Sequence, residues 1–157
     1  MTRRRFLRVA IGGAAAAVAA PALWALVTRQ GDETGAPEIA YGRDRCEQCG
    51  MIIGDRRFAA ATRRGSTVHR FDDIGCLIRH SADVLASSHA KGFVHDAGTE
   101  AWIEAPRASY VRSPAIRTPM NYNIAAYADN AEAYRASPQA PVLALDDLLA
   151  ASAKKQS

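Results

Sequence analysis

The stretch Val68-His69-Arg70-Phe71-Asp72-Asp73-Ile74-Gly75-Cys76 changes its residue pattern halfway along. Residues 67–71 predict a strand, which pairs with residues 58–62 through a turn at Arg63-Arg64-Gly65-Ser66. Asp72 or Asp73 can cap a helix, and apolar residues then recur at helical spacing as far as Leu85. The stretch therefore predicts a β-hairpin that leads directly into a helix, with Cys76 in the first turn, away from the apolar stripe.

A second strand-to-helix transition follows later in the chain. Ile124-Ala125-Ala126-Tyr127 predicts a strand, and Asp129 or Asn130 caps a helix that runs to about Ala136. Further strands are expected at 93–96, 101–104 and 142–144, and a short helix at 146–151. Residues 106–119 contain three prolines and are expected to be irregular. These elements predict an α+β fold of two packed ββαβ-like units.

The first residues predict a targeting segment. Thr2-Arg3-Arg4-Arg5-Phe6-Leu7-Arg8 precedes an uncharged run over 9–27, which is the pattern of a signal peptide. The basic segment is similar to the twin-arginine export motif. The run is also long enough to span a bilayer. Residues 1–29 are thus predicted to be a cleaved signal or a retained membrane anchor. The protein is expected to be periplasmic or otherwise extracytoplasmic, and a retained anchor would tether it to the cytoplasmic membrane.

The remaining chain divides into three parts. Residues 30–38 are polar, with two glycines and a proline, and predict a linker. A single folded domain is expected over 39–151, and a flexible tail over 152–157. The first 30 residues hold five arginines and no acid, so the rest has 15 basic and 16 acidic residues, a net charge of −1. The basic character belongs to the targeting segment, and no nucleic-acid partner is expected.

Three sulfur donors lie together in Cys46-Glu47-Gln48-Cys49-Gly50-Met51. Thiolate and thioether sulfur are soft ligands that favour Cu(I), and Gly50 leaves the backbone free to direct Met51 toward the thiols. Met120, in a turn-rich segment, is a second thioether candidate. Further candidates for completing the site are Cys76, His69 and His80.

Two other interpretations of the cysteines stay open. Cys46, Cys49, Cys76 and His80 have the residue types to close a four-ligand zinc site, which would make the domain a zinc-stapled interaction module. Cys46 and Cys49 have the spacing of a thiol–disulfide oxidoreductase, although no strand precedes them as in thioredoxin-like proteins. The sequence contains no general acid–base constellation or cofactor fingerprint, so we expect no enzyme.

Taken together, the motifs resemble the NosL family, the copper chaperones that serve assembly of nitrous-oxide reductase. The resemblance rests on the Cys46-x-x-Cys49-Gly50-Met51 motif, on Phe71-Asp72-Asp73-Ile74-Gly75-Cys76, and on Thr118-Pro119-Met120 with the strand at 124–127. It implies a fold of two ββαβ units, Cu(I) bound through the sulfurs of the first motif, and delivery of copper to a maturation machinery or an apo copper enzyme in denitrification.

The chain departs from the family pattern at two places. Many members carry a lipoprotein cysteine behind their signal, whereas this sequence has no cysteine before Cys46, so we expect no lipid anchor. Asn121 follows Met120 where a glycine is more usual. Members also occur outside nitrous-oxide reduction, and the resemblance therefore indicates the metal more firmly than the client enzyme.

Overall fold

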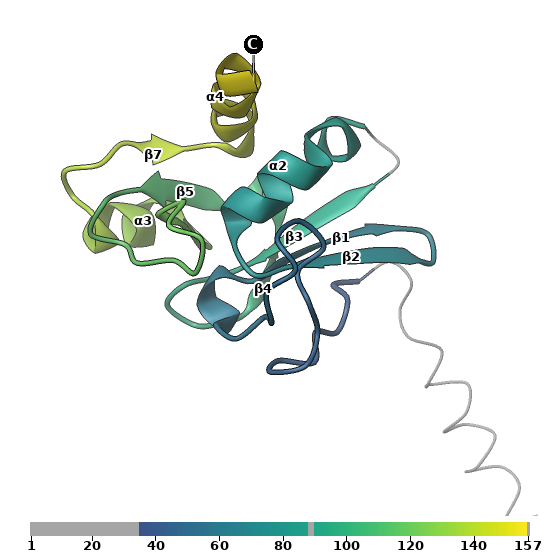
Figure 1. Cartoon of the computed structure of the whole chain (residues 1–157). Coiled ribbons are helices and arrows are strands. Elements are labelled where there is room, and N and C mark those ends of the chain that lie inside the picture. The colour runs from purple at the N-terminus through teal and green to yellow at the C-terminus, as the bar shows by residue number, and fades with distance from the viewer. Residues whose placement is uncertain (1–34, 88–89, 157) are drawn as a thin grey trace, which may run out of the picture. The chain divides into compact units, whose positions relative to one another are not determined.

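The computed structural model describes residues 35–87 and 90–156 (Figure 1). Thr34–Ser157 cluster as one compact unit. The first half of this unit holds β1 (Ala60–Arg64), β2 (Thr67–Phe71), α2 (Ile74–Leu85), β3 (Lys91–His95) and β4 (Trp102–Glu104). The predicted targeting segment at 1–29 lies outside the described residues.

The second half repeats the order of the first four elements and ends in a helix where the first half has β4. It holds β5 (Ser109–Arg112), β6 (Ile124–Tyr127), α3 (Asn130–Ala136), β7 (Val142–Leu143) and a final helix, α4 (Leu145–Gln156). Two short 3₁₀ helices, η1 (Arg56–Phe58) and η2 (Ala105–Arg107), precede β1 and β5. Among the residues that the structure describes, no helix is both long and apolar enough to cross a membrane.

The strands form two antiparallel sheets with matching connections. The first has the order β2-β1-β3-β4 and the second the order β6-β5-β7. In each sheet the first strand of the unit is central, its hairpin partner lies on one side, and the strand after the helix lies on the other. The predicted α+β fold with two ββαβ units is therefore confirmed. A parallel bridge between Asp96 and Ala126 joins the two sheets.

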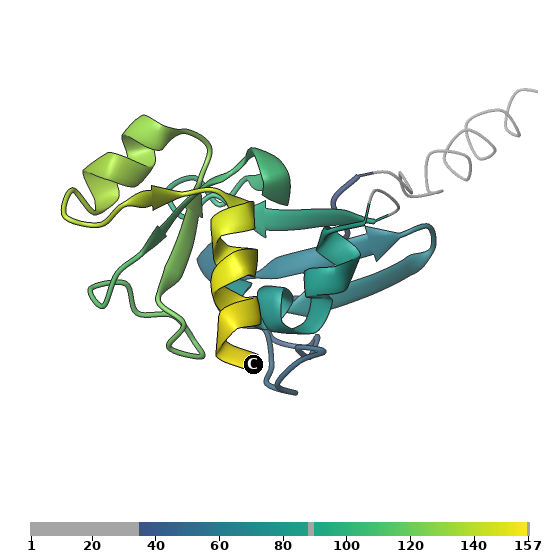
Figure 2. The same cartoon turned by 90° about the horizontal axis from the view of Figure 1, so that it is seen from above.

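Helix α2 begins where the sequence predicts. Asp73 is its N-cap, and one carboxylate oxygen accepts the Gly75 N–H at 2.8 Å. Its apolar face packs on β1 and β2, and α4 lies beside α2, as Figure 2 shows. Cys76 is wholly buried, as are Ile74 and Leu77. The expectation that Cys76 lies away from the buried face was wrong, because the hairpin and the preceding loop also cover the first turn.

The structure corrects the prediction from sequence at two further places. Residues 106–119 were expected to be irregular, yet they contain β5, the central strand of the second sheet, where Tyr110 and Val111 are fully buried. Four residues between prolines are too few to show a strand period. Helix α4 continues to Gln156, past the predicted end at Ala151.

Candidate metal centre

The Cys46–Met51 segment, which we call the cysteine loop, is a tight hairpin. Arg45 and Ile52 form an antiparallel bridge at its base. The Cys46 N–H donates to the Met51 carbonyl, and the Gly50 N–H donates to the Cys46 carbonyl, both at 2.8 Å. Gly50 has a φ of 75°, which glycine adopts without strain. The loop thereby buries Cys46 and leaves Met51 on the surface, 49% exposed.

Two contacts hold the cysteine loop and the residues after it against the segment that leads from β2 into α2. The Glu47 N–H donates to the Arg70 carbonyl at 2.9 Å. The Gly54 N–H donates to a carboxylate oxygen of Asp72 at 3.3 Å. Because Asp72 directly precedes the helix cap, these bonds bring the loop to the first turn of α2.

This arrangement gathers all three cysteines of the chain. The Sγ atoms of Cys46, Cys49 and Cys76 lie within 4.8 Å of one another, and all three are free thiols. Cys46 and Cys76 are buried, and Cys49 is half-buried at the outer side of the cluster. Cys76, a further candidate from sequence, is thus the third member of a three-sulfur cluster. The sequence signal that could have indicated this role is the place of Cys76 as the third residue of a helix capped by an aspartate.

The three thiols differ in pKa. Cys46 has its pKa lowered to about 5, chiefly because the Cys76 thiol donates a hydrogen bond to it and because backbone N–H groups of Asp72 and Cys49 also face it. The same hydrogen bond raises the pKa of Cys76, and burial raises it further. Burial raises the pKa of Cys49 as well. The cluster is therefore one thiolate held by two thiols.

Three sulfurs at this separation suit a soft metal ion. One ion about 2.3 Å from each of three thiolates holds the sulfurs roughly 4 Å apart, so sulfurs that already lie within 4.8 Å of one another need only small shifts to share one ion. Thiolates select Cu(I) and zinc over hard ions. Within 35–87 and 90–156, no histidine, carboxylate or further cysteine joins this cluster as a fourth member.

Met120 lies on a loop that reaches the same helix turn. Its backbone N–H donates to the second carboxylate oxygen of Asp73 at 3.1 Å, and its side chain is half-buried against the core. The structure therefore brings the Met120 loop to the start of the helix that carries Cys76. The sequence indicates Asp73 only as a possible helix cap, because a single sequence offers no signal for this second contact.

The histidine candidates lie beside the sulfur cluster and are not part of it. The rings of His69 on β2 and His80 on α2 are 5.1 Å apart, centroid to centroid. The Nδ1 atom of His69 is 4.0 Å from a Glu47 carboxylate oxygen, and Nδ1 of His80 is 3.0 Å from the Ser81 hydroxyl. Neither histidine is therefore a member of the sulfur cluster in this structure.

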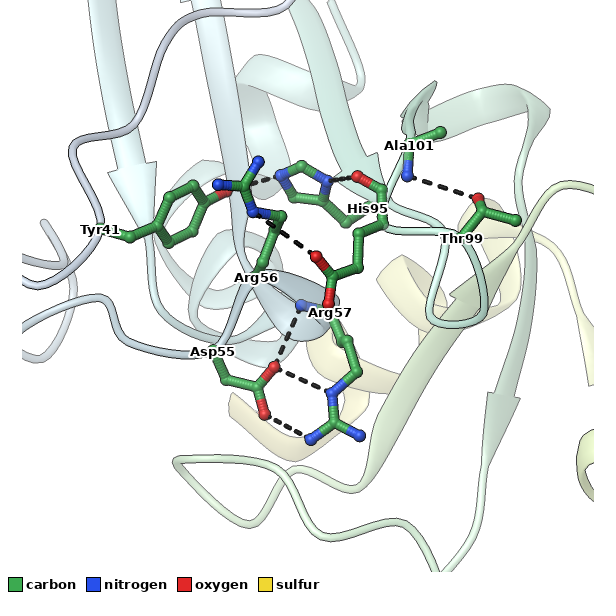
Figure 3. Close-up of polar contacts among 8 residues, drawn as sticks. Tyr41, Asp55, Arg56, Arg57, His95, Thr99 and Ala101 are labelled. Carbon is green, nitrogen blue, oxygen red and sulfur yellow. Dashed lines mark hydrogen bonds and ion pairs between the residues drawn. The ribbon is translucent and has the colours of Figure 1, made fainter.

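His95 has a structural role instead. Its Nε2 lies 2.6 Å from the Tyr41 hydroxyl and its Nδ1 2.7 Å from the Glu100 carbonyl, as Figure 3 shows for the side chains. Its ring stacks on Trp102 at 3.7 Å. Burial lowers the pKa of His95, which favours the neutral ring that donates to Glu100 and accepts from Tyr41. These contacts fix the chain just before the cysteine loop.

Comparison with known proteins agrees with the fold. The NosL family model matches residues 39–151. The crystal structure of the copper chaperone NosL from Shewanella denitrificans is similar, with a TM-score of 0.59 and 18% sequence identity over 71% of this chain and 94% of that one. At this identity the likeness shows the fold. A search of curated proteins found no match. The family match spans most of the chain, and the protein belongs to the NosL family.

Proposed function

We propose that this protein is a Cu(I)-binding metallochaperone that delivers copper for maturation of a copper enzyme. The single observation that carries the proposal is the cluster of Cys46, Cys49 and Cys76, three sulfurs within 4.8 Å. Family membership supports it, and the neighbour from Shewanella denitrificans is named as a copper chaperone. A carrier needs binding and release, not catalysis, so the proposal includes no enzymatic activity.

The exposure of the donors suits transfer. Cys46 and Cys76 are buried, Cys49 is half-buried, and Met51 is 49% exposed at the rim of the same loop. A thioether is a neutral ligand for Cu(I), and an exposed one is free to exchange. A partner's donor atoms would approach from the side of Cys49 and Met51, take the ion in steps of ligand exchange, and leave Cys49 and Cys76 to regain their protons.

The client and the location are part of the proposal. Nitrous-oxide reductase, or the machinery that matures it in denitrification, is the partner that the family resemblance implies. Transport by a twin-arginine signal would place the domain in the periplasm, and retention of the signal would tether it to the cytoplasmic membrane. Tracing a tagged full chain by cell fractionation, with Arg3 and Arg4 replaced by lysine as the control, tests this placement.

Two alternatives have less support from the geometry. A structural zinc site closes with four ligands, commonly cysteine and histidine, and His80 does not join the sulfurs. A thioredoxin-like pair occurs in a strand–helix setting, whereas Cys46 and Cys49 lie in a hairpin loop closed by Arg45 and Ile52.

Anaerobic titration of the reduced full chain with Cu(I), against a coloured Cu(I) chelator, tests the proposal. We expect one tightly bound ion per chain. Cys49→Ser should weaken binding by more than the roughly 10- to 100-fold that loss of an outer partner costs, and Cys49 is chosen because it is the least buried of the three cysteines. Met51→Ala should weaken binding less.

Two results would overturn the copper proposal. One is protein purified with stoichiometric zinc that unfolds when the zinc is chelated. The other is rapid thiol–disulfide exchange with a model substrate together with indifference to Cu(I).

A further inference from the structure

Asp73 makes two contacts that join separate parts of the chain. One carboxylate oxygen accepts the Gly75 N–H at 2.8 Å and caps α2. The other accepts the Met120 N–H at 3.1 Å, across 47 residues of sequence. Asp73 itself has no exposed surface. A buried carboxylate with both oxygens engaged is costly to disturb, because either partner would be left unsatisfied away from water.

The backbone of the Met120 loop is built to present this N–H. The Asn121 N–H donates to the Thr118 carbonyl at 3.0 Å, which closes a β-turn with Pro119 and Met120 at its centre. Proline suits the first central position, and the N–H of the second central residue has no partner within such a turn. Asp73 supplies that partner. Asn121 has a φ of 56°, which asparagine tolerates as glycine does.

A second contact presses the same loop onto the same helix turn. A Cβ atom placed on Gly75 would lie 2.0 Å from Cγ of Tyr122. The Tyr122 ring therefore occupies the space that any larger residue at position 75 would need. The loop is held to the start of α2 both through its backbone, at Met120, and through a side chain two residues later.

We infer that Asp73 is a positioning residue of the metal centre, which keeps the Met120 loop and the Cys76-bearing turn of α2 in one rigid frame. Cys76 is three residues after Asp73, so the carboxylate fixes the helix start that carries one sulfur and the backbone that carries another. Met120 thereby becomes the thioether that completes the coordination of copper by the three cysteines. This inference rests on the proposed Cu(I) function.

The test is a double-mutant cycle on Cu(I) affinity, in the reduced full chain. Asn is also a good helix cap, so Asp73→Asn keeps an oxygen for Gly75 and turns an NH₂ group toward Met120. We expect Asp73→Asn to weaken Cu(I) binding by roughly 10- to 100-fold, the usual cost of losing an outer partner. In a Met120→Ala background the same change should have little further effect, because the contact acts through Met120.

A matched control exists in the other unit. Asp129 caps α3 by accepting the Glu132 N–H at 2.8 Å, so Asp129→Asn makes the same change at a cap that faces no methionine loop. It should leave Cu(I) affinity unchanged. An affinity for Asp73→Asn equal to the wild type's, or a loss that adds in full to that of Met120→Ala, would overturn the inference, since a general loss of helix structure gives the additive result.

Hydrogen exchange separates this inference from the copper proposal. In the metal-free protein, the Met120 amide should exchange roughly tenfold faster or more in Asp73→Asn than in the wild type, whereas Asp129→Asn should not change it. If the wild type fails to bind Cu(I), the proposed function falls, and the exchange result still decides whether Asp73 holds the loop. An unchanged exchange rate of the Met120 amide in Asp73→Asn would show that Asp73 does not hold the loop.

Discussion

The two ββαβ units share their topology but differ in what their helices carry. Both helices follow the hairpin of their unit, and both begin at an aspartate, Asp73 for α2 and Asp129 for α3. The third helical position is Cys76 in the first unit and Glu132 in the second. The same backbone frame thus holds a buried thiol in one unit and a partly exposed carboxylate in the other. The comparison shows that the fold provides the position and that the residue there decides the chemistry.

The hairpins of the two units also differ. Gly65 and Ser66 alone connect β1 to β2, whereas residues 113–123 connect β5 to β6. The longer connection carries Met120 and Tyr122 to the start of α2. The second unit therefore contributes a loop to the centre in the first unit while its own helix start stays without sulfur.

The largest effect is expected when Cys76, the third residue of α2, is replaced by a residue without sulfur, so that it resembles Glu132 in α3. Cys76→Ser should remove tight Cu(I) binding, with a loss greater than roughly 100-fold, because a soft thiolate ligand is replaced by a hydroxyl, which is a poor ligand for Cu(I). Glu132→Gln at the equivalent position of α3 should leave Cu(I) affinity unchanged. Competition titration measures both, and near-UV circular dichroism checks that the variants fold. Wild-type affinity in Cys76→Ser would break the comparison.

A second effect concerns protons. Cys46, whose pKa is lowered to about 5, is ionised at pH 7, whereas Cys49 and Cys76 have raised pKa values and keep their protons. Metal ligation requires thiolates. Binding of Cu(I) at pH 7 should therefore release about two protons, and affinity should increase as the pH rises from 6 to 8.

Calorimetry in buffers of different ionisation enthalpy measures this proton release. In Cys49→Ser the number should fall to about one. Release of three protons from the wild type would show that Cys46 is not ionised beforehand, and affinity that falls with rising pH would contradict the three-thiolate site.

The smallest expected effect compares the second helical positions, Gly75 and Ala131. Gly75→Ala should lower the free energy of unfolding by about 1–3 kcal/mol, because the new Cβ overlaps the Tyr122 ring and the cost of overpacking exceeds alanine's helix preference. Ala131 is exposed, so Ala131→Gly should cost only about 0.5–1 kcal/mol, the propensity difference. Urea unfolding checks both values. A stabilised Gly75→Ala variant would mean that Tyr122 moves freely.

Local patterns predicted much of the fold. Asp73 and Asp129 were identified as possible caps, and β2, β6 and the helices after them lie where the residue periods indicated. The strand β5 was missed, because its four residues between prolines are recognisable only through the partners β6 and β7 that pair on either side. Pairing is a property of the whole chain and leaves little trace in so short a segment.

The sequence by itself determined the donors and the repeated frame. Soft sulfur in the cysteine loop and a strand that leads through aspartate into a helix follow from residue chemistry and spacing along the chain. Only the tertiary structure decided which donors meet. It placed Cys76 with Cys46 and Cys49, separated His80 from them, and joined Met120 to the helix start through Asp73. Residues far apart in sequence come together by packing and by the hydrogen-bond needs of buried groups, which no local pattern encodes.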